Sequence, residues 1–344
     1  MVKKQVNQQN RNYKPTKQNI NVEPTEANIN KPVKPNDNVF LKYKMITIFC
    51  FAFLLYSNTL FFDYTLDDQL MIYNNKFTQM GVKGLQKILT TDAFVGFFGE
   101  KKELVAGGRY RPLSHVTFAF EWEIFGRNPF IGHLINVILY SLLCVLLLYV
   151  LEDLFARYKG SNTWYLSIPF VITMLFAAHP LHTEVVANIK GRDEIMSLLG
   201  SFGTMYLLIK YLKTRKIFLL LLASIVYFLG LMSKENSITF FAVIPLAFYY
   251  FKDTKTKDIV LIMTVLFIPI LLFLIARYNA LGFFMSGKQI TELLNNPFID
   301  PSKVPPAEYP KDMKYATIIY TMALYIKLLI LPHPLTHDYY PFEI

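Results

Sequence analysis

The chain has 344 residues, of which 53% are hydrophobic, 16% aromatic and only 17% charged. A soluble domain carries about 25% charged residues, so this chain is depleted in charge. Its apolar residues fall into long runs without charge, and this pattern excludes a plain soluble enzyme and a disordered protein. We therefore predict an all-α, polytopic membrane protein.

Eight apolar runs with at most one charged residue follow one another along the chain. A helix needs roughly 20 mostly apolar residues to cross about 30 Å of hydrocarbon. The three shortest runs reach that length only if lysines at their ends extend to the membrane surface. We predict seven spans and an eighth segment, the last, that either crosses the membrane or is re-entrant. In chain order, the runs are 45–62, 128–151, 160–183, 195–209, 217–233, 236–251, 259–276 and 315–334.

The segment before the first span is basic and rich in Asn, Gln, Lys and Pro. We predict a disordered cytoplasmic tail over residues 1–40 and a membrane domain over 41–344. Every second loop after the tail is also basic, which the positive-inside rule assigns to the cytoplasm. The net charge of +10 then reflects topology and affinity for anionic membrane lipids, and no nucleic-acid partner is expected. No apolar stretch precedes 45–62, so this run is expected to act as an uncleaved signal anchor.

The first loop on the opposite side begins with two adjacent carboxylates, Asp67 and Asp68. Neighbouring carboxylates resist double ionisation, so one of them suits a general base or a metal ligand. The alternative is an ordinary solvated loop or helix cap. Apolar residues at helical spacing over 82–89 predict an amphipathic helix lying at the membrane surface.

Further along this loop, Arg109 and Arg111 follow the pair Gly107-Gly108. The glycines allow close approach of the backbone to a ligand, and the two guanidinium groups suit a phosphate. Arginines at a membrane surface also bind lipid headgroups, so this motif alone leaves both readings open.

The most concentrated cluster of ionisable residues follows the third span. Its first part contains His179, His182 and Glu184, whose side chains are candidate ligands of a divalent metal. The alternative is a turn whose charges pair among themselves, for example Lys190 with Glu194. The second part of the cluster contains Lys190, Arg192, Asp193 and Glu194.

A fourth polar segment, Lys234-Glu235, lies between the fifth and sixth spans, on the same predicted side as the others. Polar chemistry gathered on one side argues against a transporter, in which ionisable groups are expected near the middle of the bilayer.

These four segments, in this order, resemble the membrane domain of the transmembrane-and-tetratricopeptide-repeat O-mannosyltransferases, which are GT-C glycosyltransferases. The resemblance implies a GT-C-like fold with 7–8 transmembrane helices and a large first outer loop carrying interfacial helices. It also implies a hexosyltransferase that moves a sugar, typically mannose, from a dolichyl- or polyprenyl-phosphate donor to a Ser or Thr hydroxyl of a protein. Transfer would take place on the lumenal or periplasmic face.

The resemblance places the catalytic base in the first outer loop, at Asp67 or Asp68. No metal is assigned, because a monophosphate donor does not require one; His179, His182 and Glu184 are the candidates for Mg or Mn if a metal is used. The residues expected to bind substrate or phosphate are Arg109, Arg111, His179, His182, Glu184, Lys190, Arg192, Asp193, Lys234 and Glu235.

Members of this family usually continue into further spans and a helical-repeat domain. We therefore expect an incomplete membrane domain, and a separate repeat-domain protein as one partner. Two other functions stay open: a polysaccharide-assembly protein (polymerase, ligase or flippase) and an inactive truncated scaffold. The abundance of Asn, Lys and Ile favours a bacterial inner membrane over the endoplasmic reticulum.

Overall fold

The structure is a computed structural model. It describes residues 35–101, 109–158, 163–282 and 307–336, and also the separate residues 296, 298–300 and 303. The chain divides into two units, Met1–Val39 and Phe40–Ile344. Almost all of the predicted tail over 1–40 lies outside the described residues, as do Gly107 and Gly108.

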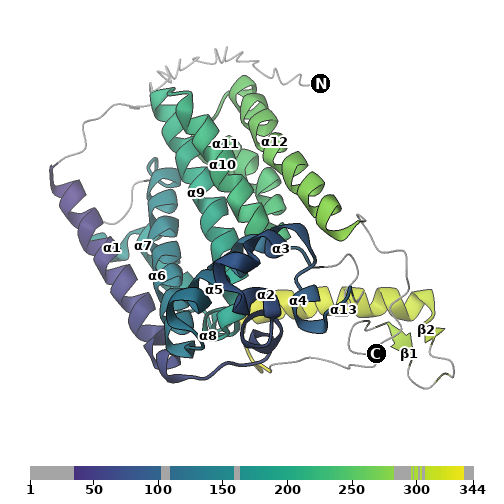
Figure 1. The fold of residues 1–344 in the computed structure, drawn as a ribbon. Coiled ribbons are helices and arrows are strands. Elements are labelled where there is room, and N and C mark those ends of the chain that lie inside the picture. Colours follow the sequence, from purple (N-terminus) through teal and green to yellow (C-terminus); the bar gives the residue numbers. More distant parts are fainter. Residues whose placement is uncertain are drawn as a thin grey trace, which may run out of the picture. The chain divides into compact units, whose positions relative to one another are not determined.

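Each of the eight predicted spans coincides with a helix, which confirms an all-α polytopic membrane protein (Figure 1). Five helical segments are long and apolar enough to cross a membrane, whereas α7, α10 and α11 are shorter apolar helices. The helices are α1 (Pro35–Tyr56), α6 (Pro129–Leu154), α7 (Ile168–Ala178), α9 (Arg192–Thr214), α10 (Phe218–Ser233), α11 (Phe240–Lys252), α12 (Thr256–Leu281) and α13 (Lys311–Ile330).

Most of the helices begin or end several residues away from the predicted bounds, and two of these differences have a clear local cause. The span predicted over 195–209 extends at both ends into α9, because charged residues on its first and last turns continue the helix. The span predicted over 160–183 is represented by the 11-residue α7. This helix ends before His179, whose ψ of 123° is the extended conformation that a following proline, here Pro180, favours.

The first outer loop folds into short helices that pack on one another. Asn75 caps α2 and donates hydrogen bonds to the carbonyl oxygens of Leu70 at 3.0 Å and Ala93 at 3.1 Å. The Thr78 hydroxyl lies 2.8 Å from Nε2 of the buried His115. Burial lowers the pKa of His115 to about 3, so the ring is neutral. The short helices are η1 (Ser57–Phe61), η2 (Gln69–Tyr73), α2 (Lys76–Gln79), η3 (Gly81–Gly84), α3 (Leu85–Thr90), α4 (Val95–Phe98) and α5 (Pro112–Phe125).

The amphipathic helix predicted over 82–89 is present as η3 followed by α3. Ile88 is buried, whereas Val82 and Leu89 remain exposed. In Figure 1 the short helices lie at one end of α9 and α10, and α5 contacts both of these helices.

Helices α9 and α10 cross closely through two glycines. A Cβ on Gly200 would lie 2.6 Å from the Cα of Gly230, a distance that real Cβ atoms do not show. Just beyond this crossing, the buried Tyr227 hydroxyl donates to the carbonyl of Ser237 at 3.1 Å, and the hydroxyls of Ser197 and Ser237 are 2.7 Å apart. The chain after α10 is therefore held against α9, and this packing places the Lys234-Glu235 turn.

The basic loops meet at the other end of these helices. Asp153 at the end of α6 pairs with both Lys213 and Lys252, and Arg157 pairs with Asp253. These ion pairs join the loops after α6, α9 and α11, as the alternation of basic loops predicts.

The last described segment contains the antiparallel pair β1 (Ile299–Asp300) and β2 (Ala307–Glu308), followed by α13. Helix α13 is long and apolar enough to span a membrane, and in Figure 1 it runs across the direction of α9 and α12. Its described contact with the loop after α7 is a hydrogen bond of 3.1 Å between His179 Nε2 and the carbonyl of Leu329.

Candidate functional site

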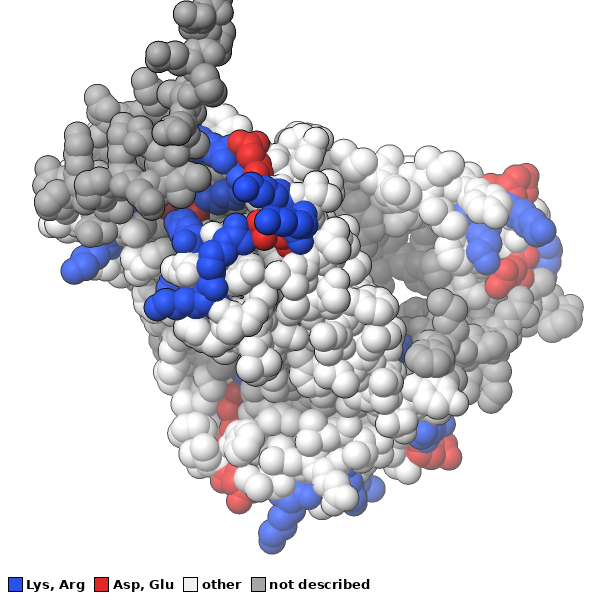
Figure 2. Space-filling view, turned by 90° about the horizontal axis from the view of Figure 1, so that it is seen from above, with Lys and Arg blue, Asp and Glu red and all other residues white. Residues whose placement is uncertain are grey.

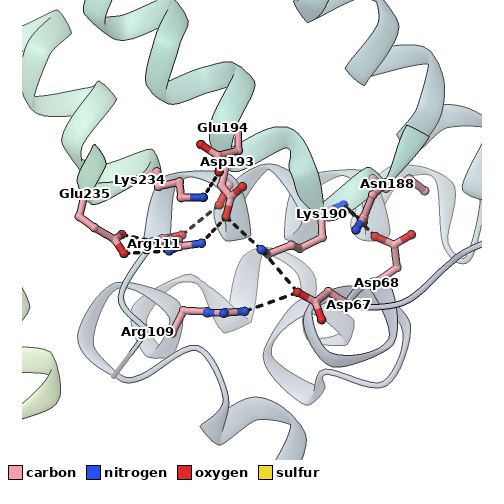
Figure 3. A network of polar contacts seen from close by, with 12 residues as sticks. Asp67, Asp68, Arg109, Arg111, Asn188, Lys190, Asp193, Glu194, Lys234 and Glu235 are labelled. Atoms are coloured by element: carbon pink, nitrogen blue, oxygen red, sulfur yellow. Dashed lines mark hydrogen bonds and ion pairs between the residues drawn. The ribbon is translucent and has the colours of Figure 1, made fainter. Parts of the chain in front are cut away.

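The four polar segments converge into one network of ion pairs at the end of the bundle that carries the first outer loop (Figure 3). Each segment comes from a turn that precedes or follows a helix, so short backbone elements position every charged group. The third segment is set by η5 (Ile189–Gly191) and the first turn of α9, and the fourth by η6 (Glu235–Thr239).

Asp68 is the buried member of the carboxylate pair. Its Oδ2 accepts a hydrogen bond from the backbone N–H of Thr65 at 2.9 Å, and its Oδ1 accepts one from the backbone N–H of Lys190 at 2.7 Å. Burial raises the pKa of Asp68 to about 6, although both backbone hydrogen bonds favour the ionised form. Asp68 thus connects the first outer loop to the turn before α9.

The turn that Asp68 closes is strained. Leu66 has a φ of +43°, a region that residues other than glycine rarely adopt. This conformation costs about 1–2 kcal/mol, and the hydrogen bond from Thr65 to Asp68 spans it. The strained turn gives the two neighbouring carboxylates different surroundings.

Asp67 is the accessible member of the pair, with 42% of its side chain exposed. Its Oδ2 lies 3.6 Å from Arg109 Nη1 and 3.6 Å from Lys190 Nζ. Both distances exceed those of hydrogen bonds, so these donors stay available to another anion. The Arg109 guanidinium stacks over the Phe94 ring at 4.9 Å, and burial together with the neighbouring Arg111 lowers the pKa of Arg109.

Arg111, in contrast, has its donors occupied. Its guanidinium donates to both carboxylate oxygens of Glu235, at 2.8 and 3.0 Å, and to Oδ2 of Asp193 at 2.8 Å. Burial opposes ionisation of Glu235, but the hydrogen bonds and charge of Arg111 prevail and lower its pKa to about 2. Arg111 therefore joins the outer loop to α9 and η6.

Asp193 is 2% exposed and lies at the centre of the network. Its Oδ2 also lies 3.4 Å from Lys190 Nζ, whereas its buried Oδ1 has no hydrogen-bond partner among the described residues. Beside it, Lys234 forms an ion pair with Glu194. Burial lowers the pKa of Lys234 to about 8. The pair of Lys190 with Glu194, the example of a turn whose charges pair among themselves, does not form: Lys190 lies near Asp67 and Asp193, and Glu194 pairs with Lys234.

Arg192 does not join this network, although the sequence suggested it for phosphate binding. Its side chain is fully buried and points between α5 and α6. It donates to Asn136 Oδ1 at 2.8 Å, to the Gly132 carbonyl at 3.0 Å and to Thr117 Oγ1 at 3.0 Å, and it pairs with Glu121. Since 192 is one position away from 193 on a helix, the two side chains face different directions.

His179, His182 and Glu184 do not assemble into a metal site. The two imidazole rings are 5.9 Å apart, with His179 directed to α13 and His182 Nδ1 2.8 Å from the Tyr140 hydroxyl. Glu184 is exposed on α8 (His182–Ala187). Within the described part of the chain, no three His, Cys, Asp or Glu side chains lie close enough to hold a metal ion.

His182 instead lines a groove of about 260 Å³ beside the network. Burial lowers the pKa of His182, which favours the neutral ring. The groove runs between α6, α8, α9 and η6, with Glu194 from the network in its lining and a largely apolar wall. The apolar wall contains Leu143, Phe176, Ile195, Leu198 and Phe240.

Three residues with structural roles were not assigned from the sequence. Asn188 accepts a hydrogen bond from the backbone N–H of Lys190 at 3.1 Å, which is the asparagine cap expected at the start of a helix. Tyr140 and Glu121 contact His182 and Arg192 from distant parts of the chain, and no local pattern marks them.

Comparison with known proteins shows that the chain is similar to protein O-mannosyl-transferases. It is 33% identical to the protein O-mannosyl-transferase TMTC1 of Homo sapiens over 147 residues, which is 42% of this chain and 15% of that protein. It is 31% identical to TMTC2 of Mus musculus over 47% of this chain and 18% of that protein. It is 35% identical to Tmtc3 of Drosophila melanogaster over 26% of this chain and 11% of that protein.

The matched part of the chain thus spans less than a fifth of each relative's length. No family model and no solved structure matches the chain. The similarity confirms the resemblance that the four ordered motifs indicated.

Proposed function

We propose that this protein transfers mannose from a polyprenyl- or dolichyl-phosphate donor to a Ser or Thr hydroxyl of a protein acceptor. One observation carries the proposal: the accessible carboxylate of Asp67 lies 3.6 Å from each of two cations, Arg109 and Lys190, whose side chains donate no shorter hydrogen bond to a residue that the structure describes. Lys190 also lies 3.4 Å from Asp193. A carboxylate beside two available cations offers a base and a phosphate site within a few ångströms.

The chemistry is a displacement at the anomeric carbon of the donor. The acceptor oxygen forms a bond to this carbon while the bond from the carbon to the phosphate oxygen breaks, and the lipid phosphate leaves with the electron pair. The hydroxyl proton passes to the carboxylate of Asp67. Positive charge develops on the sugar and negative charge on the departing phosphate. Arg109 and Lys190 stabilise the negative charge of the phosphate.

The structure favours different roles for the two carboxylates. Asp67 is accessible to an acceptor, whereas Asp68 is buried and bound to two backbone N–H groups. We assign Asp67 as the base and Asp68 as the residue that positions it. Asp193 then holds Lys190 and Arg111, and Glu235 holds Arg111, whereas Lys234, paired with Glu194, adds a further cation beside the donor phosphate. No step is assigned to a metal ion.

The lipid chain of the donor has a place in the groove beside the network. Its apolar wall suits isoprenoid units, and Glu194 lies where the groove meets the charged residues. A volume of about 260 Å³ accommodates only the first units of a chain, so the remainder would extend into the surrounding lipid.

We propose that the site faces the lumen or periplasm and that the N-terminus is cytoplasmic, as the basic loops at the opposite end favour. A separate repeat-domain partner and a bacterial inner membrane stay predictions from the sequence. The three relatives named above are animal proteins, so membrane fractionation in the source organism is the direct test of the compartment.

The experiment compares Asp67→Asn, Asp68→Asn and the control Asp63→Asn in membranes supplied with labelled polyprenyl-phosphate mannose and a Ser/Thr peptide. Asp63 is exposed on the same loop, and its carboxylate accepts a hydrogen bond from the adjacent backbone N–H of Tyr64. We expect at least a 100-fold loss for Asp67→Asn, the size expected when a general base is removed, and no change for the control.

Full transfer activity in Asp67→Asn at equal protein level would refute the assignment of the base. Competition by a diphosphate-linked oligosaccharide, but not by the monophosphate donor, would instead indicate a polysaccharide-assembly protein. Absence of donor binding in the wild-type chain would indicate a scaffold.

A further inference from the structure

The end of the bundle opposite the candidate site contains a second cavity, of about 630 Å³. It lies among the first turns of α1, the last turns of α6 and α9, and the start of α10. Figure 2 shows this end of the molecule, where Lys and Arg side chains gather with few Asp and Glu between them. The cavity is thus formed by the ends of apolar helices, at the level where a membrane's headgroups meet its hydrocarbon.

One wall of the cavity is basic and has a surplus of positive charge. Lys210, Lys213 and Lys216 line it together with the carboxylates of Glu152 and Asp153. Both carboxylates are already neutralised by cations: Glu152 pairs with Lys44, and Asp153 pairs with Lys213 and Lys252. Lys44 and Lys252 do not line the cavity themselves, but their ion pairs with Glu152 and Asp153 leave the three lysines of the wall with a surplus of positive charge.

Lys210 and Lys216 supply most of this surplus, because neither forms an ion pair within the described part of the chain. The Lys210 ammonium lies 4.5 Å from the centre of the Tyr206 ring, which holds it at the cavity by a cation–π contact. The Tyr206 and Tyr149 rings are 5.9 Å apart, and both line the cavity. Tyrosines at this depth are typical of residues that contact lipid headgroups.

The other wall is apolar. It is built by Leu41 from α1, Phe218 and Leu219 from α10, and Ala156 from the end of α6. Phe218 is 57% exposed, which is unusual for a large aromatic side chain in water but ordinary for one that meets acyl chains. A free phosphate has no group to place against this wall, whereas a phospholipid has both a phosphate and an apolar part.

We propose that this cavity binds one anionic phospholipid, with its phosphate at Lys210 and Lys216 and its glycerol and first acyl carbons against Phe218 and Leu219. A negatively charged headgroup matches the surplus charge, and a volume of about 630 Å³ is within the usual range for a ligand site. Basic pockets between membrane helices are a known mode of binding anionic lipids. The site is separate from the charged network of the opposite end and does not depend on its function.

The test is lipid binding by the purified full chain, measured by native mass spectrometry with phosphatidylglycerol and phosphatidylcholine. The test variant is Lys210→Gln/Lys216→Gln. The control is Lys255→Gln/Lys257→Gln, which removes the same charge from the same end of the bundle, at the start of α12 and outside the cavity. A lysine near an anionic lipid contributes about 5-fold in affinity, so we expect about a 25-fold loss for the test variant and less than a 3-fold loss for the control.

Phe218→Ala provides a second measurement that keeps all the charges. We expect it to weaken phosphatidylglycerol binding while leaving the weak binding of inorganic phosphate unchanged. Equal losses in the test and control variants would overturn the proposal in favour of diffuse charge. Equal affinity of the wild type for both lipids, or displacement of phosphatidylglycerol by millimolar inorganic phosphate, would overturn it as well.

Discussion

Replacing Arg192 tests whether this residue binds substrate or stabilises the fold. The Arg192 side chain is fully buried and joins α9 to α5 and α6 through Glu121, Thr117, Asn136 and the Gly132 carbonyl. Arg192→Met keeps a long side chain of similar volume but removes the charge and every donor. The variant leaves the carboxylate of Glu121, which is only 17% exposed, without its cation.

Removing one partner of a buried ion pair costs about 3–5 kcal/mol, because the remaining charge is neither hydrated nor paired. Burial raises the pKa of Glu121 even with Arg192 present, so the variant will take up a proton there as the pH falls. The cost is therefore expected to be smaller at pH 5 than at pH 7. Arg192→Met/Glu121→Gln removes both charges and should recover about 1–3 kcal/mol of the loss.

The measurement is denaturant or thermal unfolding of the purified protein in one detergent, at pH 5 and pH 7. For a chain of this size, about 3 kcal/mol corresponds to a fall in Tm of roughly 4 °C. The affinity of the folded variant for the donor should match that of the wild type. A free energy of unfolding within about 1 kcal/mol of the wild type, together with a weaker donor affinity, would refute the structural role of Arg192.

Three further predictions follow from the packing and the pKa values. Gly200→Ala should lower the free energy of unfolding by about 1–3 kcal/mol, because the new Cβ meets the backbone of Gly230. Gly203→Ala should cost less in the same thermal assay, because the nearest atom to its new Cβ, Val226 Cγ1 at 3.1 Å, has to move by only a few tenths of an ångström; equal losses would contradict the close crossing. Burial raises the pKa of Asp68 from 3.8 to about 6. Between these two pH values the carboxyl group is ionised in the unfolded chain but still protonated in the folded protein, so the free energy of unfolding should fall by about 3 kcal/mol as the pH rises from 4 to 6. Asp68→Asn should not show this decrease. If the free energies of unfolding of the variant and the wild type changed in parallel between pH 4 and 7, the raised pKa of Asp68 would be contradicted. Burial lowers the pKa of Lys234 to about 8, so this side chain loses its charge above pH 8 and KM for the donor should rise there. Arginine stays charged, so Lys234→Arg should keep KM constant to about pH 9. Identical KM profiles of the variant and the wild type would contradict a role of the Lys234 charge in donor binding.

The sequence by itself determined the class of protein, the positions of its apolar helices and the separation of its loops into two groups. These features depend on local properties: an apolar helix satisfies its own backbone hydrogen bonds, and its length must match the hydrocarbon. The runs at 128–151 and 259–276 accordingly coincide with α6 and α12. Sequence also located the four charged segments, because clusters of ionisable residues between apolar runs are conspicuous.

Only the tertiary structure decided what each charged residue contacts. Asp67 and Asp68 are adjacent and chemically identical, yet one is accessible and the other accepts a backbone hydrogen bond from Lys190, a residue 122 positions away. Arg192 and Asp193 are also adjacent, but a helical turn directs one between α5 and α6 and the other into the network. The partners of these side chains come from distant segments, so their roles depend on how the helices pack and not on the local sequence.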